Sequence, residues 1–97
     1  MAYDPGAIDA TLAAAVGDEP GLIAELRLAF VESAERAHAA MIAAETVEAW
    51  KNAAWRLKGL AASFGAIRLM ALASEAVTVA PGDATTIAKL KRAIERL

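Results

Sequence analysis

The chain contains no cysteine, a single histidine and few aromatic residues among its 97 positions. The absence of cysteine excludes disulfides, thiolate metal sites and cysteine nucleophiles, and it suits a reducing compartment. The lone His38 has no second histidine and no closely placed carboxylate pair with which to bind a metal ion. Because serine–histidine pairs, glycine-rich phosphate loops and zinc spacings are also missing, we expect no enzyme, no metal and no cofactor.

Strong charge of either sign is lacking too. Ten basic and twelve acidic residues are interspersed and give a net charge of −2, so no cationic surface is expected to bind a phosphate backbone. Charged residues interrupt each apolar run well before membrane-spanning length, and the first residues, MAYDPGAID, do not have the layout of a signal peptide. The sequence therefore predicts a cytoplasmic protein without nucleic-acid or membrane partners.

What the chain does contain is alanine, leucine and isoleucine in quantity, which favours closely packed helices over sheets. A length of 97 residues suits one compact domain, so we expect residues 1–97 to form a single all-α unit. Helix starts are indicated at Asp4-Pro5, at Asp18-Glu19-Pro20, at Thr46 with Glu48, and at Asp83. Stops are indicated at Gly17, at Gly65 and at a Pro81-Gly82 turn, which leaves a fourth helix between the last two.

Short connections make consecutive helices antiparallel neighbours, so the pattern predicts an up-down-up-down antiparallel four-helix bundle with a short N-terminal capping helix. The inward residues expected from spacings of three and four are Ile8, Leu12 and Val16; Leu22, Ile23, Leu26, Phe30, Ala37, Met41 and Ala44; Val47, Trp50, Ala54, Leu57, Ala61 and Phe64; Ile67, Met70, Ser74 and Val77; and Ile87, Leu90, Ile94 and Leu97. His38 is expected at the boundary of the core, without a special role.

Trp55 breaks the pattern of the third helix. At about 100° per residue it falls roughly 130° from the centre of the stripe between Val47 and Phe64, so it is expected to face outward. The same outer sector collects Glu48, Lys51, Asn52, Lys58, Gly59 and Ala62. A glycine inside a helix costs about 1 kcal/mol relative to alanine, and Gly59 would lower the surface one turn beyond Trp55 and let another group approach.

Each of these residues also has an alternative interpretation without a binding role. Trp55 is then covered by the N-terminal helix or by a neighbouring loop, Gly59 relieves crowding between helices, and Lys58 is an ordinary solvated lysine.

The third helix also carries a motif. Trp55-Arg56-Leu57-Lys58-Gly59, followed by small residues and Phe64-Gly65-Ala66, resembles the signature of histidine-containing phosphotransfer (HPt) domains, which reads His-x-Leu-Lys-Gly, small residues, then Leu or Phe-Gly-Ala. The resemblance covers nearly the whole chain and implies a four-helix bundle with a short N-terminal helix. It further implies that Lys58 corresponds to the lysine beside the phosphohistidine and Gly59 to the glycine that makes room for the phosphoryl group.

The chain departs from the family at the position that matters most. Trp55 replaces the histidine that accepts the phosphoryl group, and an indole offers neither a nucleophile nor a proton acceptor. The resemblance therefore implies a degenerate, non-transferring member of a two-component phosphorelay lineage. Its expected partner is the receiver domain of a response regulator or a related signalling protein, bound through Lys51, Trp55, Lys58, Gly59 and Ala62.

Two further functions remain as alternatives. The chain is a variant of an active phosphotransfer protein in which the histidine was replaced, or it is a structural bundle that self-associates through the tryptophan face as a homodimer.

Overall fold

The computed structural model describes residue 12 and residues 19–97, and over these residues the chain is helical and has no strand. The helices are α2 (Pro20–Ala43), α3 (Val47–Ser63), α4 (Ile67–Ala76) and α5 (Ala84–Glu95). The all-α prediction is confirmed for this part of the chain. The predicted N-terminal helix lies outside the described residues except for Leu12, which is buried and belongs to the hydrophobic core.

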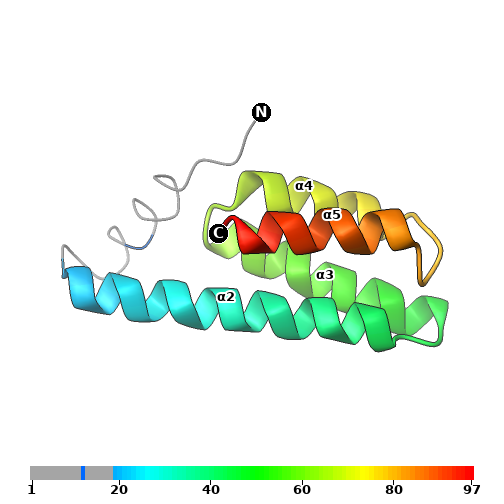
Figure 1. Ribbon diagram of the computed structural model, residues 1–97, viewed down its shortest axis with the longest axis horizontal. Coiled ribbons are helices and arrows are strands. Elements are labelled where there is room, and N and C mark those ends of the chain that lie inside the picture. The colour runs from blue at the N-terminus through cyan, green and yellow to red at the C-terminus, as the bar shows by residue number, and fades with distance from the viewer. Residues whose placement is uncertain (1–11, 13–18) are drawn as a thin grey trace.

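Each of the four helices packs against two others. Figure 1 shows α2, the longest, lying beside α3, with α4 and α5 covering the same core from the other side. The contacts run from α2 to α3, from α3 to α4, from α4 to α5 and from α5 back to α2. This closed ring around one apolar interior is the arrangement of a four-helix bundle. Over the described residues, no helix combines the length and the apolarity needed to cross a membrane.

Three of the predicted helix starts, at Pro20, Thr46 and Asp83, are confirmed, and the one at Asp4-Pro5 lies outside the described residues. Thr46 accepts a hydrogen bond on its side-chain oxygen from the backbone N–H of Ala49 at 3.0 Å, and α3 begins at the next residue. Asp83 accepts from the backbone N–H of Thr86 at 2.9 Å and from its hydroxyl at 2.6 Å. Pro20 opens α2, where its missing N–H costs no helical hydrogen bond. These caps use donors that have no partner within the helix itself.

The connections contain the two described glycines that have positive φ. Gly65 (φ 74°) follows α3 and Gly82 (φ 81°) precedes α5, a backbone conformation that costs glycine little. The fourth helix is shorter than predicted, because it ends at Ala76 rather than near the turn at 81–82. Thr78 explains the early end: its N–H and its hydroxyl both donate to the carbonyl oxygen of Glu75, which closes a turn instead of extending the helix.

The side chains of Trp50 and His38 make polar contacts between helices inside the bundle. The indole of Trp50 is fully buried and donates from Nε1 to the carbonyl oxygen of Ala76 at 2.7 Å, which ties α3 to the end of α4. His38 is 9% exposed, and its Nε2 lies 3.0 Å from the carbonyl oxygen of Ile87, between α2 and α5. Since a carbonyl only accepts, this contact requires the proton on Nε2. The histidine serves the packing of the bundle.

Some residues predicted to face the core are exposed. Val47 is 56% exposed, Ile67 54% and Leu22 38%. Helix α4 buries Leu69, Leu72, Ala73 and Ala76, whereas of the predicted stripe Met70, Ser74 and Val77 are half-buried, with Met70 and Val77 packed against the core, and Ile67 is exposed. The reason is that α4 is apolar on nearly all sides, so two stripes fit the helical period equally well and only packing against α3 and α5 selects one.

Candidate docking surface on helix α3

The candidate docking surface consists of Lys51, Trp55, Lys58, Gly59 and Ala62. Their spacings of three, four and seven place them on one side of α3. Trp55, Lys58, Gly59 and Ala62 are exposed and Lys51 is half-buried. The other side of the same helix is buried in the core through Trp50, Ala53, Ala54, Leu57 and Ala61. The structure thus brings the five predicted residues together on a solvent-facing surface.

The indole of Trp55 is 53% exposed, whereas that of Trp50 on the same helix is fully buried. The prediction that Trp55 faces outward is confirmed, and no described loop covers it; the alternative in which the N-terminal helix covers it falls on residues that the structure does not describe. An exposed indole is a large, rigid apolar group with an N–H donor at one edge. Such side chains contribute strongly to binding when a partner removes them from water.

Gly59 has open space where a side chain would be. A Cβ built on Gly59 meets no atom within 4 Å, apart from its chain neighbours and the adjacent backbone of its own helix. The alternative that this glycine relieves crowding between helices is therefore wrong. The propensity cost of this glycine is therefore not explained by packing against any described residue. The missing side chain leaves a flat area beside Trp55, where the backbone or a bulky group of another molecule can approach the helix closely.

Lys51 and Lys58 give the surface its charge. Neither ammonium group forms a hydrogen bond or an ion pair with another residue in the described part of the chain. Glu48, one turn before Lys51, is exposed and carries the opposite charge. Lys51, Lys58 and Glu48 together give this side of α3 one excess positive charge, on a chain whose net charge is negative. It therefore attracts acidic groups, over a range of about 8 Å at physiological ionic strength.

Val47 adds apolar surface that the sequence analysis assigned to the core. It lies eight residues before Trp55, which is about 80° around the helix at about 100° per residue. A signal for its exposure was present in the sequence. Val47 directly follows the capping residue Thr46, and the first turn of a helix at the end of a bundle has fewer neighbours to cover it. Periodicity alone does not register that end effect.

The surface carries no imidazole at the position of Trp55. The position that the HPt signature gives to a nucleophilic imidazole carries an indole, whose nitrogen lone pair belongs to the aromatic system. Among the described residues, no group of three or more histidine, cysteine, aspartate or glutamate side chains is placed to hold a metal ion. The ring of Trp55, the two unpaired cations and the open space at Gly59 supply apolar contact, charge and room for a partner.

Comparisons with known protein families, with curated proteins and with solved structures found no match to this chain.

Proposed function

We propose that the chain is an HPt-like signal-transduction module that binds the receiver domain of a response regulator, or a related signalling protein, without accepting a phosphoryl group. The binding surface is Lys51, Trp55, Lys58, Gly59 and Ala62 on α3. The observation that carries the proposal is the exposure of Trp55, 53%, at the motif position where the family places its phosphoacceptor. The proposal includes a cytoplasmic location and makes the chain a binding module rather than an enzyme.

The up-down-up-down topology belongs to the same proposal. The connections between α2 and α3 and between α3 and α4 span only residues 44–46 and 64–66, so each helix returns beside its predecessor. Residues 77–83 join α4 to α5, which are again in contact. The short connections and the contacts between consecutive helices support this topology, which is the one expected from the resemblance.

The physical support comes from three properties of the docking surface. Trp55 supplies apolar area, Gly59 leaves space for close approach, and the unpaired charges of Lys51 and Lys58 favour an acidic partner. The charge should act mainly on the rate of association and on specificity, and the ring on affinity. Replacement of the nucleophile by a group of larger contact area converts a transfer site into a binding site.

The test is a calorimetric titration of the purified protein with isolated receiver domains, each in its unphosphorylated form and with a phosphate-mimicking ligand. We expect at least one receiver to bind, with affinity reduced by more than about tenfold in Trp55→Ala. Ile42→Ala is the matched control, because Ile42 is 55% exposed and belongs to α2 rather than to the docking helix α3. The control should bind like the original protein.

Two results would overturn the proposal: no receiver binds, or binding is the same with and without the ring of Trp55. Sedimentation of the protein alone at several concentrations tests the alternative of self-association, because a homodimer formed through the tryptophan face should dissociate in Trp55→Ala and persist in Ile42→Ala.

A further inference from the structure

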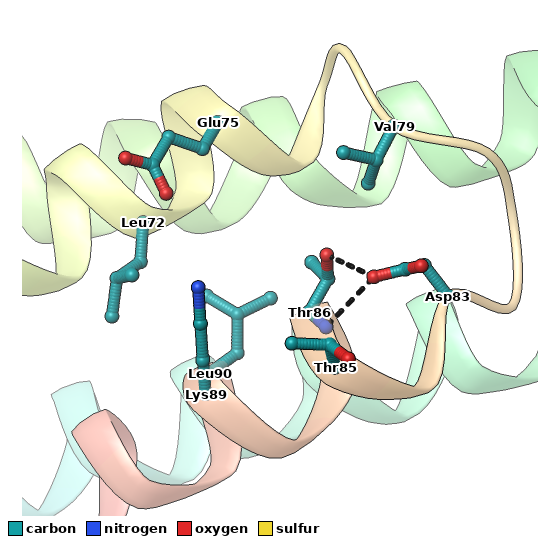
Figure 2. A pocket seen from close by; sticks show the side chains of 8 residues that line it. All are labelled: Leu72, Glu75, Val79, Asp83, Thr85, Thr86, Lys89 and Leu90. Atoms are coloured by element: carbon teal, nitrogen blue, oxygen red, sulfur yellow. Dashed lines mark hydrogen bonds between the residues drawn. The ribbon is translucent and has the colours of Figure 1, made fainter.

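A second candidate site lies between α4 and α5, on elements that do not include the docking helix. The pocket there has a volume of about 220 Å³ and is partly open to solvent. Figure 2 shows its walls: α4 contributes Leu72 and Glu75, the connecting segment contributes Val79 and the capping Asp83, and α5 contributes Thr85, Thr86, Lys89 and Leu90.

The pocket combines an apolar lining with two charged side chains that form no hydrogen bond or ion pair through their charged groups. Leu72, Val79 and Leu90 supply hydrocarbon surface, and Leu72 and Leu90 are themselves core residues. The side chains of Glu75 and Lys89 reach toward the space between the two helices from opposite sides (Figure 2). Neither forms a hydrogen bond or an ion pair through its charged group with another described residue, although each is within the walls of one pocket.

Asp83 is committed to another role. Its carboxylate accepts hydrogen bonds from the hydroxyl and the backbone N–H of Thr86 and caps α5. The ammonium of Lys89 interacts electrostatically with this carboxylate but forms no ion pair with it, so the charged groups of the pocket that have no hydrogen-bonded partner are the carboxylate of Glu75, on α4, and the ammonium of Lys89, on α5. A ligand that satisfies both must carry an ammonium and a carboxylate together, and a ligand that also uses Leu72 and Leu90 must carry a hydrocarbon group.

The volume sets the size of that ligand. A cavity of about 150 Å³ holds benzene, with its six carbon atoms. In proportion, about 220 Å³ has room for about nine non-hydrogen atoms. An aliphatic α-amino acid of the size of leucine or isoleucine has that number, together with the two charges and the branched hydrocarbon chain that the walls require.

We propose that the α4–α5 pocket binds a small aliphatic amino acid, with its ammonium group at Glu75, its carboxylate at Lys89 and its side chain against Leu72, Val79 and Leu90. The site is independent of the docking surface on α3 and of any binding to a receiver domain. Because both charged side chains are exposed, the ion pairs are weakened by water and the dissociation constant is expected to be roughly millimolar.

The experiment is an amide-resolved NMR titration of the whole protein with L-leucine at constant pH and ionic strength. We expect saturable shifts centred on the amides of Val79, Thr86 and Leu90. Two leucine analogues provide the chemical controls: 4-methylpentanoate lacks the ammonium group, and 3-methylbutylamine lacks the carboxylate. Each should bind several-fold more weakly than leucine, by up to about fivefold for each lost ion pair.

Variants test the orientation of the ligand. Glu75→Gln and Lys89→Gln should each weaken leucine binding, whereas Lys91→Gln, at an exposed lysine of α5 outside the pocket, should leave it unchanged. The double variant Glu75→Lys with Lys89→Glu exchanges the two charges and should bind leucine more tightly than either Glu75→Gln or Lys89→Gln. The reason is that the amino acid can bind in the reversed orientation. The proposal is overturned if leucine produces no saturable shifts, if the two analogues bind as tightly as leucine, or if the shifts map outside α4 and α5.

Discussion

Trp50 and Trp55 lie five residues apart on α3, and the helix turns their indoles to opposite environments. Trp50 is fully buried and donates to the carbonyl oxygen of Ala76 at 2.7 Å, whereas Trp55 is 53% exposed and has no hydrogen-bond partner among the described residues. Five residues correspond to about 140° around the helix, which is enough to move a side chain from the core stripe to the solvent face. One helix thus carries a structural tryptophan and a candidate binding tryptophan, and substitutions can separate the two roles.

Trp50→Phe should destabilise the fold. The phenyl ring is smaller than the indole and lacks the N–H, so the variant leaves a cavity and removes the shorter of the two hydrogen bonds to the carbonyl oxygen of Ala76, which keeps only that from the N–H of Val79 at 3.3 Å. We expect the free energy of unfolding to fall by about 2–4 kcal/mol, measured by urea denaturation. Trp55→Phe is the matched control and should change it by less than about 0.5 kcal/mol. Equal losses in the two variants would contradict the assignment of Trp50 to the core.

Gly59→Ala should act on stability and on binding in opposite directions. The new Cβ meets no atom within 4 Å, and alanine is the better helix former, so we expect the free energy of unfolding to rise by about 0.5–1 kcal/mol. If a partner approaches closely at this position, the same methyl group should weaken receiver binding.

Gly21→Ala is the control for that experiment, since a Cβ at Gly21 also meets nothing within 4 Å and the residue lies in the first turn of α2. It should leave receiver binding unchanged. A Gly59→Ala protein that is more stable and binds as tightly as the original would show that the flat area beside Trp55 is not used by the partner.

The parts of the fold that the sequence predicted well are those governed by local chemistry. The caps Thr46 and Asp83 and the glycine turn at Gly65 are set by side-chain oxygens and by backbone conformation within a few residues. The outward position of Trp55 also follows from local geometry, because α3 has one clear apolar side and the angle from it is fixed by the helix.

The core side of α4 did not follow from the sequence. Ile67 and Leu69 are two residues apart and both large and apolar, yet the first is 54% exposed and the second 1%. Helical periodicity gives the same support to either, and the choice depends on contacts with α3 and α5, which are distant in sequence. The α4–α5 pocket was not predicted for the same reason, because Glu75 and Lys89 line one pocket only through the packing of two helices.

Asp83 should make the stability of α5 depend on pH. Its pKa lies below the ordinary value of 3.8 because the carboxylate accepts hydrogen bonds from the hydroxyl of Thr86 and then from its backbone N–H. A carboxyl group whose pKa is lower in the folded than in the unfolded chain stabilises the fold at pH values above its pKa in the unfolded chain. That stabilisation is lost as the pH falls through its pKa in the folded chain. Asp83→Asn should therefore reduce the acid sensitivity of unfolding below about pH 4, relative to the original chain.

Thermal or urea unfolding at a series of pH values measures this difference. Glu95→Gln, at an exposed carboxylate of the same helix with no hydrogen-bond partner among the described residues, is the matched control and should leave the acid profile unchanged. Identical acid profiles for Asp83→Asn and the original chain would show that the cap has no charge-dependent part.

Trp55→His should test how much of a phosphotransfer site remains on α3. The position is exposed, and tryptophan and histidine have similar helix propensities, so the free energy of unfolding should change by less than about 0.5 kcal/mol. A histidine there would present an imidazole next to Lys58 and the open space at Gly59, and an imidazole nitrogen is a nucleophile that an indole nitrogen is not. If the residues around position 55 are otherwise intact, the variant should accept the phosphoryl group of a phosphorylated receiver domain. The measurement is the appearance of an acid-labile phosphate label on the protein.

The sharper form of this experiment compares three proteins. Trp55→Gln removes the ring without adding a nucleophile and should remain unlabelled, and Trp55→His combined with Lys58→Ala should be labelled more slowly than Trp55→His alone, because the cation beside the imidazole would no longer attract the phosphoryl group. If Trp55→His is labelled and Trp55→Gln is not, this chain differs from a transfer protein by one side chain. An unlabelled Trp55→His that still folds and still binds a receiver would mean that docking persists while more than one feature of the transfer chemistry has changed.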